Sequence, residues 1–189
     1  MIESDSLPTI SGDRVRLRAL SSGDLEALYA IFSDAEVMRY WSHAPFSDIA
    51  EAESYLADIR RGVMSRSLFQ WGLCRSEDDR VIGTCTLWQF DAANRRCEIG
   101  FALAREHWGG GWMSEGLTVL IDYTFSQLGL LRLEADVDPR NAASITLLER
   151  LGFEREGYMR ERWLVEGKTA DSVFYGLLAK DWLSDRSST

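Results

Sequence analysis

The sequence predicts one α/β domain over residues 1–189, with a mixed, mostly antiparallel sheet of about seven strands and flanking helices. Three observations lead to this fold class. The 189 residues are 46% hydrophobic and 27% charged, as in a single globular domain. Short segments of alternating polar and apolar residues are interspersed with segments of helical period. No repeat, linker or change of composition divides the chain.

The chain opens with one predicted strand and two predicted helices. Residues 14–20 alternate apolar and basic side chains, as in a strand with one face in solvent. Ser22 is typical of an N-cap, and apolar residues at helical spacing run from Leu25 to Phe32. Residues 48–66 predict a second amphipathic helix. The loop between these helices is aromatic and has no regular period.

The rest of the chain is mostly strand, with two further helices. Strands are predicted, in chain order, over residues 68–74, 81–90, 97–104, 132–137, 158–165 and 172–178. A long helical pattern runs from Met113 to Leu128 and ends at Gly129, and a short helix before the last two strands ends at Gly152. The first three of these strands should form an antiparallel meander. The unit from Cys97 to Val137 should be a right-handed parallel crossover.

Charge and cysteine content exclude several classes of function. The chain has 21 basic and 30 acidic residues, a net charge of −9, which disfavours nucleic-acid binding and favours cationic partners. It has no apolar run of membrane-spanning length, and its N-terminus lacks the features of a signal peptide. Cys74, Cys85 and Cys97 are widely spaced and predict buried thiols rather than a metal site. A reducing, cytoplasmic location is therefore expected.

The segment with the clearest chemistry is Trp108-Gly109-Gly110-Gly111-Trp112, which lies between a predicted strand and a predicted helix. Glycines allow close approach of the backbone to a ligand, and a helix N-terminus offers free N–H groups and partial positive charge. Together they favour a phosphate or pyrophosphate. The dinucleotide fingerprint fails because Ser114 occupies its third glycine position, and the ATP-type loop fails because Arg162 occupies its first.

The loop resembles the pyrophosphate loop of the GNAT superfamily of N-acyltransferases, with the pattern Q/R-x-x-G-x-G/A. Trp108 and Met113 depart from that pattern, whereas Gly111 fits it. WGGGWMSEG is closer to the W-G-x-G-x-x-x-E version found in ribosomal-protein N-terminal acetyltransferases of the Rim type. EIGFAL, RLEADVDPRNAASITLLERLGFEREG and the opening segments RVRLRAL and DLEALYAIFSDAEVMRYW also resemble that branch. The resemblance covers nearly the whole chain.

The resemblance implies the GNAT fold and acetyl-CoA as the co-substrate. The backbone of Phe101, Ala102 and Leu103 should pair with the pantetheine arm, in a gap where the fourth and fifth strands splay apart. Asn141 should also reach this arm. The pyrophosphate should be held by backbone N–H groups of the loop, namely Trp108, Gly109, Gly110, Gly111, Trp112, Met113 and Ser114. No metal is implied.

Two residues are candidates for catalysis, each with a structural alternative. Glu98 is placed to take the proton of the amine, directly or through water, or else is a surface carboxylate beside Arg95 and Arg96. Ser144 is placed to donate a hydrogen bond to the leaving thiolate, or else satisfies the first turn of a helix. Leu148 occupies the position at which many family members have a tyrosine acid.

Other conspicuous residues have simpler interpretations. Glu115 is expected to interact with the helix macrodipole, and His107 to be a loop histidine near solvent. Tyr158 is expected to pack within a strand. Trp71 and Trp88 should lie in the core or the cleft wall. The aromatic loop with Tyr40, Trp41, His43 and Phe46 either overlies the acceptor cleft or caps the sheet as a small core.

The predicted function is direct transfer of an acetyl group from acetyl-CoA to a primary amine, such as the N-terminus of a ribosomal protein. A small-molecule amine acetyltransferase, for an antibiotic or a polyamine, is the first alternative, and a non-catalytic acyl-CoA sensor is the second. The partners expected are an acyl donor and a cationic amine, with neither nucleic acid nor membrane. A homodimer is left open.

Overall fold

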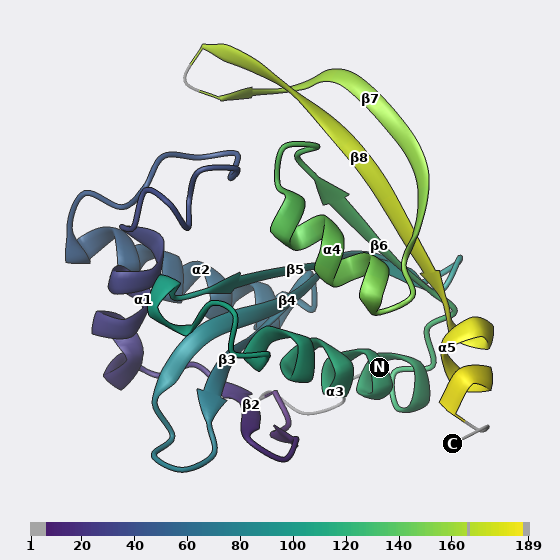
Figure 1. Cartoon of the computed structure of the whole chain (residues 1–189). Helices are drawn as coiled ribbons and strands as arrows, with labels where there is room; N and C mark the ends of the chain where they lie inside the picture. The colour runs from purple at the N-terminus through teal and green to yellow at the C-terminus, as the bar shows by residue number, and fades with distance from the viewer. Residues whose placement is uncertain (1–6, 166, 187–189) are drawn as a thin grey trace.

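A computed structural model describes residues 7–165 and 167–186. Within this part of the chain, eight strands form one sheet in the order β1-β2-β3-β4-β5-β6-β8-β7 (Figure 1). Their bounds are β1 Ile10–Ser11, β2 Val15–Ala19, β3 Leu68–Arg75, β4 Val81–Asp91, β5 Arg96–Leu103, β6 Arg132–Val137, β7 Glu154–Val165 and β8 Lys168–Leu178. The mixed fold is confirmed, with one strand more than predicted because the two-residue β1 is too short for a recognisable pattern.

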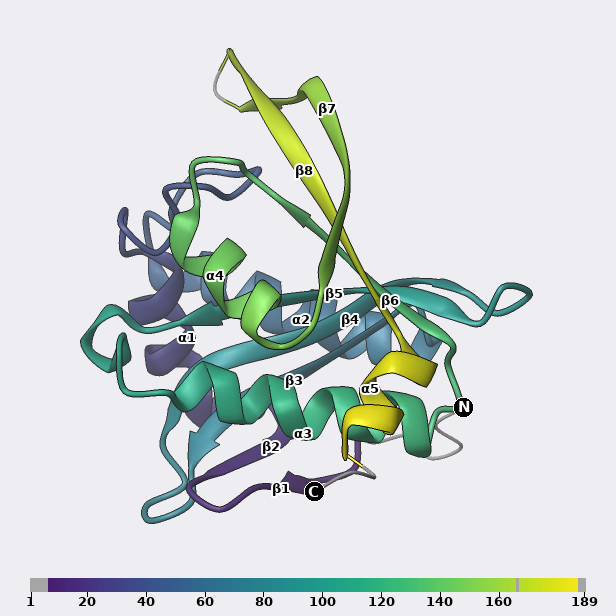
Figure 2. The same cartoon turned by 45° about the vertical axis from the view of Figure 1, so that its right-hand side comes forward.

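Helices cover both faces of the sheet (Figure 2). The α-helices are α1 Leu25–Phe32, α2 Ile49–Ser65, α3 Trp112–Ser126, α4 Ala142–Arg150 and α5 Ala179–Arg186, and two short 3-10 helices span Ser22–Asp24 and Arg105–His107. α1 and α2 bury their apolar sides with residues of one face of the sheet. α3 and α4 pack on the other face and form the larger core.

The start of the first helix differs by one residue from the prediction. Ser21, rather than Ser22, is the N-cap, and it forms a capping box with Asp24. Arg18 also donates to both carboxylate oxygens of Asp24, at 2.9 and 2.8 Å. Burial disfavours the ionised Asp24, but the hydrogen bonds from Arg18 and Ser21 outweigh it and hold the pKa of Asp24 below its usual value. This network fixes β2 against α1.

The centre of the sheet separates into two halves. β3, β4 and β5 form the predicted antiparallel meander. β5 and β6 are parallel, as predicted, but they pair only from Arg96 to Glu98 on β5 and from Arg132 to Glu134 on β6. β6 continues to Val137 alongside β8, whereas β5 continues to Leu103 alongside β4. The edges that face each other beyond Glu98 are therefore left unpaired.

The β7–β8 hairpin is the most prominent extension of the molecule. It rises from the sheet and bends away from the body, with β7 as the edge strand (Figures 1 and 2). Its turn contains Gly167, whose φ of 77° is readily accessible to glycine. Glu166, which falls between the predicted strands 158–165 and 172–178, lies outside the described residues.

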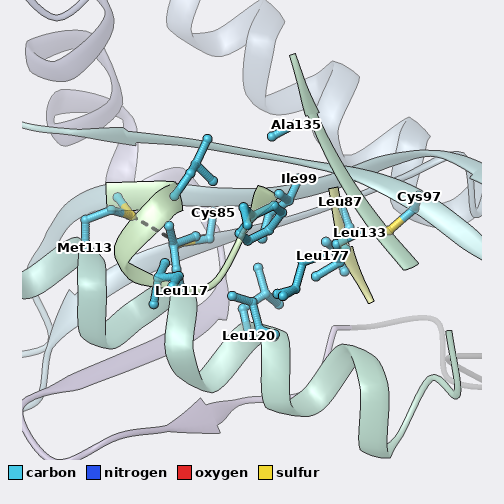
Figure 3. Packing of buried hydrophobic residues seen from close by; sticks show 14 of the residues in the cluster. Cys85, Leu87, Cys97, Ile99, Met113, Leu117, Leu120, Leu133, Ala135 and Leu177 are labelled. Atoms are coloured by element: carbon cyan, nitrogen blue, oxygen red, sulfur yellow. Dashed lines mark hydrogen bonds between the residues drawn. The ribbon is translucent and has the colours of Figure 1, made fainter. Parts of the chain in front are cut away.

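The three cysteines are buried and free, as predicted. Cys85 and Cys97 lie in the core beneath α3, and the Cys85 thiol is 3.7 Å from the Met113 sulfur (Figure 3). Cys74 lies on the opposite side, beneath α1 and α2. Burial raises the pKa of the Cys74 and Cys97 thiols to about 12, and that of Cys85 also rises. All three are therefore protonated side chains that act in packing.

Candidate active site

A cleft of about 580 Å³ lies where β5 and β6 separate. Its walls come from five parts of the chain, namely the loop after α1, the end of β4, the middle of β5, the end of β6 with the start of α4, and the β7–β8 hairpin. The lining includes Tyr40, Trp41, Trp88, Glu98, Phe101, Asp136, Asn141, Ser144, Trp163 and Asp171. The two catalytic candidates of the sequence analysis thus line the same cleft.

Glu98 lies at the apex of the separation, as the last β5 residue paired with β6. Burial is the main reason that its pKa is raised, and the negative charges of Asp136 and Glu134 raise it further. Arg162 and Arg96 oppose this shift without cancelling it. A carboxylate with a raised pKa is a better proton acceptor near neutral pH than an ordinary glutamate.

Asn141 and Ser144 occupy the N-terminus of α4, on the opposite side of the cleft from β5. Asn141 is the N-cap, and its side-chain oxygen accepts a hydrogen bond from the Ser144 backbone N–H at 3.2 Å. This bond fixes the Asn141 side chain at the N-terminus of α4. Both residues are partly exposed, and their side chains lie at a helix N-terminus, where negative charge is stabilised.

The three β5 residues predicted to hold the pantetheine arm differ in their surroundings. Phe101 lines the cleft. Ala102 is buried in the core beneath α1 and α2, so only its backbone is placed to contact a ligand. The Leu103 carbonyl accepts a hydrogen bond from the Trp108 indole N–H at 2.8 Å, which fixes the glycine loop to the end of β5.

The glycine loop fits a pyrophosphate. Gly109 and Gly111 have φ values of 75° and 78°, which disfavour other residues, and a Cβ at Gly109 would meet no atom within 4 Å. Gly111 is the N-cap of α3 and provides no side chain to bond the first N–H groups of that helix. The predicted loop therefore exposes the N-terminus of a 15-residue helix beside the open edge of β5.

Arg14 and Glu115 form a contact at this loop that the sequence analysis missed. The Glu115 carboxylate accepts from the backbone N–H groups of Arg14 and Val15 at 2.6 and 3.2 Å, and from the Arg14 Nε at 2.9 Å. Arg14 also donates to the Gly110 carbonyl at 3.2 Å, and its guanidinium lies 4.7 Å from the centre of the Trp112 ring. We call this the Arg14–Glu115 clasp. It joins β2 to the glycine loop and is more specific than the macrodipole interaction predicted for Glu115.

Other expectations are confirmed or corrected by the structure. Trp71 is fully buried and Trp88 lines the cleft, as expected. His107, by contrast, ends the 3-10 helix Arg105–His107, and its side chain is only 16% exposed, with its ring centre 6.4 Å from that of Trp112. Tyr158 lies on a strand as expected, but it is 47% exposed because β7 is an edge. Leu148 is buried and places no acid in the cleft.

The loop after α1 combines both roles that the sequence left open. Arg39, Tyr40, Trp41 and Ser42 line the cleft. Trp41 and Phe46 also pack on Phe32, with ring centres 5.4 and 5.5 Å apart, and His43 stacks on Phe46. The aromatic cluster therefore supports one wall of the cleft.

Asp136 is a cleft residue that the sequence analysis did not single out. It lies on β6, and its negative charge acts on Glu98. The indole N–H of Trp163 lies 3.3 Å from its carboxylate, and the Arg162 Nε lies at 3.4 Å. Asp136 therefore couples the hairpin to the region of Glu98. In the sequence, Asp136 alternates with the apolar Ala135 and Val137. This pattern predicts only that its side chain faces away from the core.

Comparisons with known proteins agree with this geometry. The family model of the acetyltransferase (GNAT) domain matches residues 14–154 of this chain. The chain is 36% identical to a Bacillus licheniformis protein named uncharacterized N-acetyltransferase p20, over 93% of this chain and 99% of that one. It is 29% identical to YdaF of Bacillus subtilis, provisionally named a ribosomal N-acetyltransferase, over 92% and 96% of the two chains.

The solved structures show the same fold. The spermidine N-acetyltransferase of Vibrio cholerae, solved with CoA and spermine, superposes with a TM-score of 0.80 at 24% identity, over 91% of this chain and 99% of that one. In the part of the chain that the structure describes, no helix is long and apolar enough to cross a membrane. The same residues contain no group of three or more side chains suited to hold a metal ion.

Proposed function

The chain belongs to the GNAT family of acetyltransferases and uses acetyl-CoA as its co-substrate, and from that premise we propose that it transfers the acetyl group directly to a primary amine, with Glu98 as the general base. The observation that carries this proposal is the position of Glu98. It lies at the apex of the β5–β6 separation and has a raised pKa. We further propose that residues 1–189 form one such domain, because β7 and β8 extend the same sheet beyond residue 154.

The proposed binding site for acetyl-CoA runs along the open edge of β5 to the start of α3. The free backbone groups of β5 beyond Glu98 are available to pair with the pantetheine arm, and the loop from Trp108 to Ser114 offers N–H groups to the pyrophosphate. Asn141 approaches the same path from the opposite side. When bound, acetyl-CoA supplies the activated acetyl carbonyl.

The chain's own residues then handle two protons. Glu98 accepts a proton from the incoming ammonium, which leaves the nitrogen lone pair free to form the new C–N bond. Backbone N–H groups stabilise the negative charge that develops on the carbonyl oxygen. As the C–S bond breaks, its electron pair goes to sulfur, and the Ser144 hydroxyl donates a hydrogen bond to the thiolate. The second proton of the attacking nitrogen passes to this sulfur, which leaves the neutral amide and the free thiol of coenzyme A. No cysteine serves as a nucleophile, since all three thiols are buried and protonated.

The acceptor that the cleft favours is an amine on an extended chain that can also pack against aromatic side chains. Four carboxylates line the cleft, namely Glu98, Asp136, Asp138 and Asp171, and so do three cations, Arg39, Arg140 and Lys168. Arg140 is already paired with Asp138, at 2.5 Å. Glu98 and Asp136 are the anionic pair nearest the separation, although Asp136 is partly neutralised by Arg162 at 3.4 Å, and Tyr40, Trp41 and Trp163 provide apolar walls. A peptide N-terminus matches this mixture, and the name of YdaF supports a ribosomal protein.

A polyamine is the second candidate acceptor. The Vibrio cholerae structure was solved with spermine, and the Glu98–Asp136 pair would attract an ammonium group in the same way. Of the cleft cations, Arg39 is paired with Glu36 and Arg140 with Asp138, whereas Lys168 has no ion pair among the described residues. Lys168 favours the peptide, because a peptide carries carbonyl oxygens that it can bind whereas a polyamine carries none.

The test measures release of coenzyme A by the purified chain against a panel of amines. The panel contains basic N-terminal peptides, the same peptides with a blocked N-terminus, spermidine and an aminoglycoside. We expect the free peptides to react and the blocked ones to be inert, with product mass increased by one acetyl group. Turnover of spermidine alone would favour the second acceptor. Binding of acetyl-CoA without turnover of any amine would indicate a sensor and contradict the proposal.

A further inference from the structure

Trp88 is an aromatic cleft residue that takes no part in the steps of acetyl transfer. It lies near the end of β4 and is partly exposed in the cleft wall. Among the described residues, it forms neither a hydrogen bond nor a stacking contact with another ring. The indole N–H groups of Trp71, Trp108 and Trp163, by contrast, are bonded at 2.9, 2.8 and 3.0 Å. The Trp88 ring is therefore available to a ligand.

The register of the sheet places this ring beside Glu98. Trp88 and Glu98 lie directly opposite each other on the antiparallel strands β4 and β5, so their side chains share one face of the sheet. The ring leans along β5 onto Gly100, where a Cβ would lie 2.5 Å from the ring atom Cζ3 and 2.6 Å from Cη2. Because β5 no longer pairs with β6 after Glu98, the ring covers the first residue of that face in the open part of the cleft.

The backbone of β4 is irregular directly after Trp88. The register with β5 shifts between Trp88 and Asp91, and Gln89, which also lines the cleft, has a φ of 52°. This left-handed conformation is uncommon for a residue other than glycine. Bulges and strained backbone of this kind are concentrated at ligand sites, where they direct a side chain. The irregularity thus adjoins the residue whose ring lines the cleft.

The ring and Glu98 together provide what an ammonium group binds. Within the part of the chain that the structure describes, no hydrogen bond or ion pair engages the Glu98 carboxylate. Asp136 adds a second negative charge from β6. A tryptophan ring attracts a cation within about 6 Å of its centre, more strongly than tyrosine or phenylalanine does. A protonated amine suits both groups, because it has N–H donors for the carboxylate and a positive charge for the ring.

We propose that Trp88 is a specificity residue of the acceptor site, whose ring binds the protonated amine of the acceptor beside Glu98. This rests on the proposed function, since Glu98 as the base determines where the amine lies. An amine within hydrogen-bond reach of Glu98, on the open side of the strand separation, lies next to the ring that covers Gly100. Trp88 thus selects a charged amine before proton transfer, and a neutral group of similar shape lacks this attraction.

The experiment measures the dissociation constants of two peptides by isothermal titration calorimetry, with coenzyme A in place of acetyl-CoA so that no transfer occurs. One is a basic peptide with an N-terminal alanine, and the other carries a propionyl group there and lacks only the amino group. At pH 7, roughly one unit below the pKa of an α-amino group, the first peptide is mostly protonated. We expect the wild type to bind the amine peptide at least ~10-fold more tightly than the propionyl peptide.

Substitution of Trp88 should reduce this preference without affecting the cofactor. Trp88→Leu should lower it about 5-fold through the loss of the ring, and Trp88→Phe, which keeps a weaker ring, should lie between. Phe90→Leu is the matched control, because Phe90 is an aromatic residue of the same strand that packs on Phe69 at the core. It should leave the preference unchanged. The increase in Tm produced by coenzyme A establishes that each variant is folded and binds the cofactor.

Two results would overturn the proposal. One is a wild type that does not distinguish the two peptides, whether it binds both or neither. The other is a Trp88→Leu variant with the preference of the wild type. If Trp88→Leu fails to fold, Trp88→Phe decides the outcome by the same measure. A wild type that prefers the amine peptide but releases no coenzyme A when acetyl-CoA is supplied would contradict the proposed function and leave the role of Trp88 in binding intact.

Discussion

Glu98 is a carboxylate in a position that disfavours its ionised form, and this has consequences for both activity and stability. If Glu98 is the base, Glu98→Gln should lower turnover about 100-fold or more at neutral pH with the affinity for acetyl-CoA nearly intact. In the wild type, the rate should fall with decreasing pH at a value above the ordinary pKa of glutamate, since burial, Asp136 and Glu134 raise the pKa of Glu98. Steady-state kinetics over pH 5–9, roughly centred on neutrality, measures both.

Two further variants sharpen this prediction. Asp136→Asn removes a negative charge near Glu98, so the acidic limb of the rate profile should move to lower pH while turnover above it persists. Ser144→Ala should lower turnover with little change in the profile. Unchanged rates in both Glu98→Gln and Ser144→Ala would mean that catalysis depends mainly on positioning of a neutral amine.

The same raised pKa predicts an effect on folding. An ionised Glu98 is less favourable in the folded than in the unfolded chain, so the cost is fully present above the folded pKa and vanishes below the unfolded value of about 4.3. Glu98→Gln should therefore increase the free energy of unfolding at pH 8 and leave it unchanged near pH 4. Urea unfolding at the two pH values measures this, and stabilisation at both would argue against a titration effect.

Two substitutions of Gly111 separate the effect of the glycine loop on acetyl-CoA binding from the effect of its backbone conformation on stability. Its φ of 78° should make Gly111→Ala less stable by about 1–2 kcal/mol, with the response to acetyl-CoA largely retained. Gly111→Glu adds a side chain and a negative charge beside the N-terminus of α3 and should abolish the increase in Tm produced by acetyl-CoA. Thermal unfolding with and without ligand measures both. Equal shifts for wild type and Gly111→Glu would remove this loop from the binding site.

At the scale of elements, the Arg14–Glu115 clasp predicts that β2 controls the glycine loop. Glu115→Ala removes the acceptor of two backbone N–H groups and one guanidinium, and should cost about 1.5–3 kcal/mol of stability. It should also raise KM for acetyl-CoA more than it lowers kcat, since Arg14 would no longer be held against Gly110. Glu26→Ala, at an exposed acid in the first turn of α1, is the control and should change neither.

The clasp also has a defined pH dependence. Burial opposes ionisation of Glu115, but the hydrogen bonds from Arg14 and Val15 prevail and lower its pKa. Its contribution is therefore present above the unfolded pKa of about 4.3 and is lost as the pH falls through the folded value. The stability difference between wild type and Glu115→Ala should accordingly shrink in acid. A constant difference down to pH 3, roughly, would contradict the ionic origin.

The elements that could be predicted are those with a local pattern. Alternation identified β2 and β6, helical spacing identified α2 and α3, and the glycines identified the loop before α3. β1 has two residues, and α5 has little apolar periodicity, so neither gave a usable pattern. The contact between Arg14 and Glu115 spans about a hundred residues, and no local pattern specifies it.

The arrangement of the cleft was predicted only in part for the same reason. Glu98 and Ser144 were found from their places in a motif, and the structure brings both to one cleft. Asp136 acts on Glu98 because β6 lies beside β5, which depends on the order of strands in the sheet. The exposure of Tyr158 likewise depends on β8 separating β7 from β6, so that β7 becomes the edge.

At the scale of the whole molecule, the net charge of −9 predicts a long-range attraction for cationic acceptors. Interactions of this kind are screened over about 8 Å at physiological ionic strength. The apparent KM for a basic peptide should therefore rise with salt while kcat stays nearly constant. Because three cations also line the cleft, the rise should be moderate. Kinetics from low to high sodium chloride, with a neutral amine as control, measures this. A neutral acceptor preferred over all cationic ones, without salt dependence, would contradict it.

The burial of all three thiols determines how turnover can be followed. A colorimetric disulfide reagent reacts only with thiolate that it can reach, and Cys74, Cys85 and Cys97 are neither ionised nor accessible in the folded chain. The native enzyme should give no background colour, so the dye can be present throughout the reaction and counts each released coenzyme directly. In denaturant the same dye would register three equivalents per chain, so one reagent reports product in the native state and loss of structure in the unfolded one.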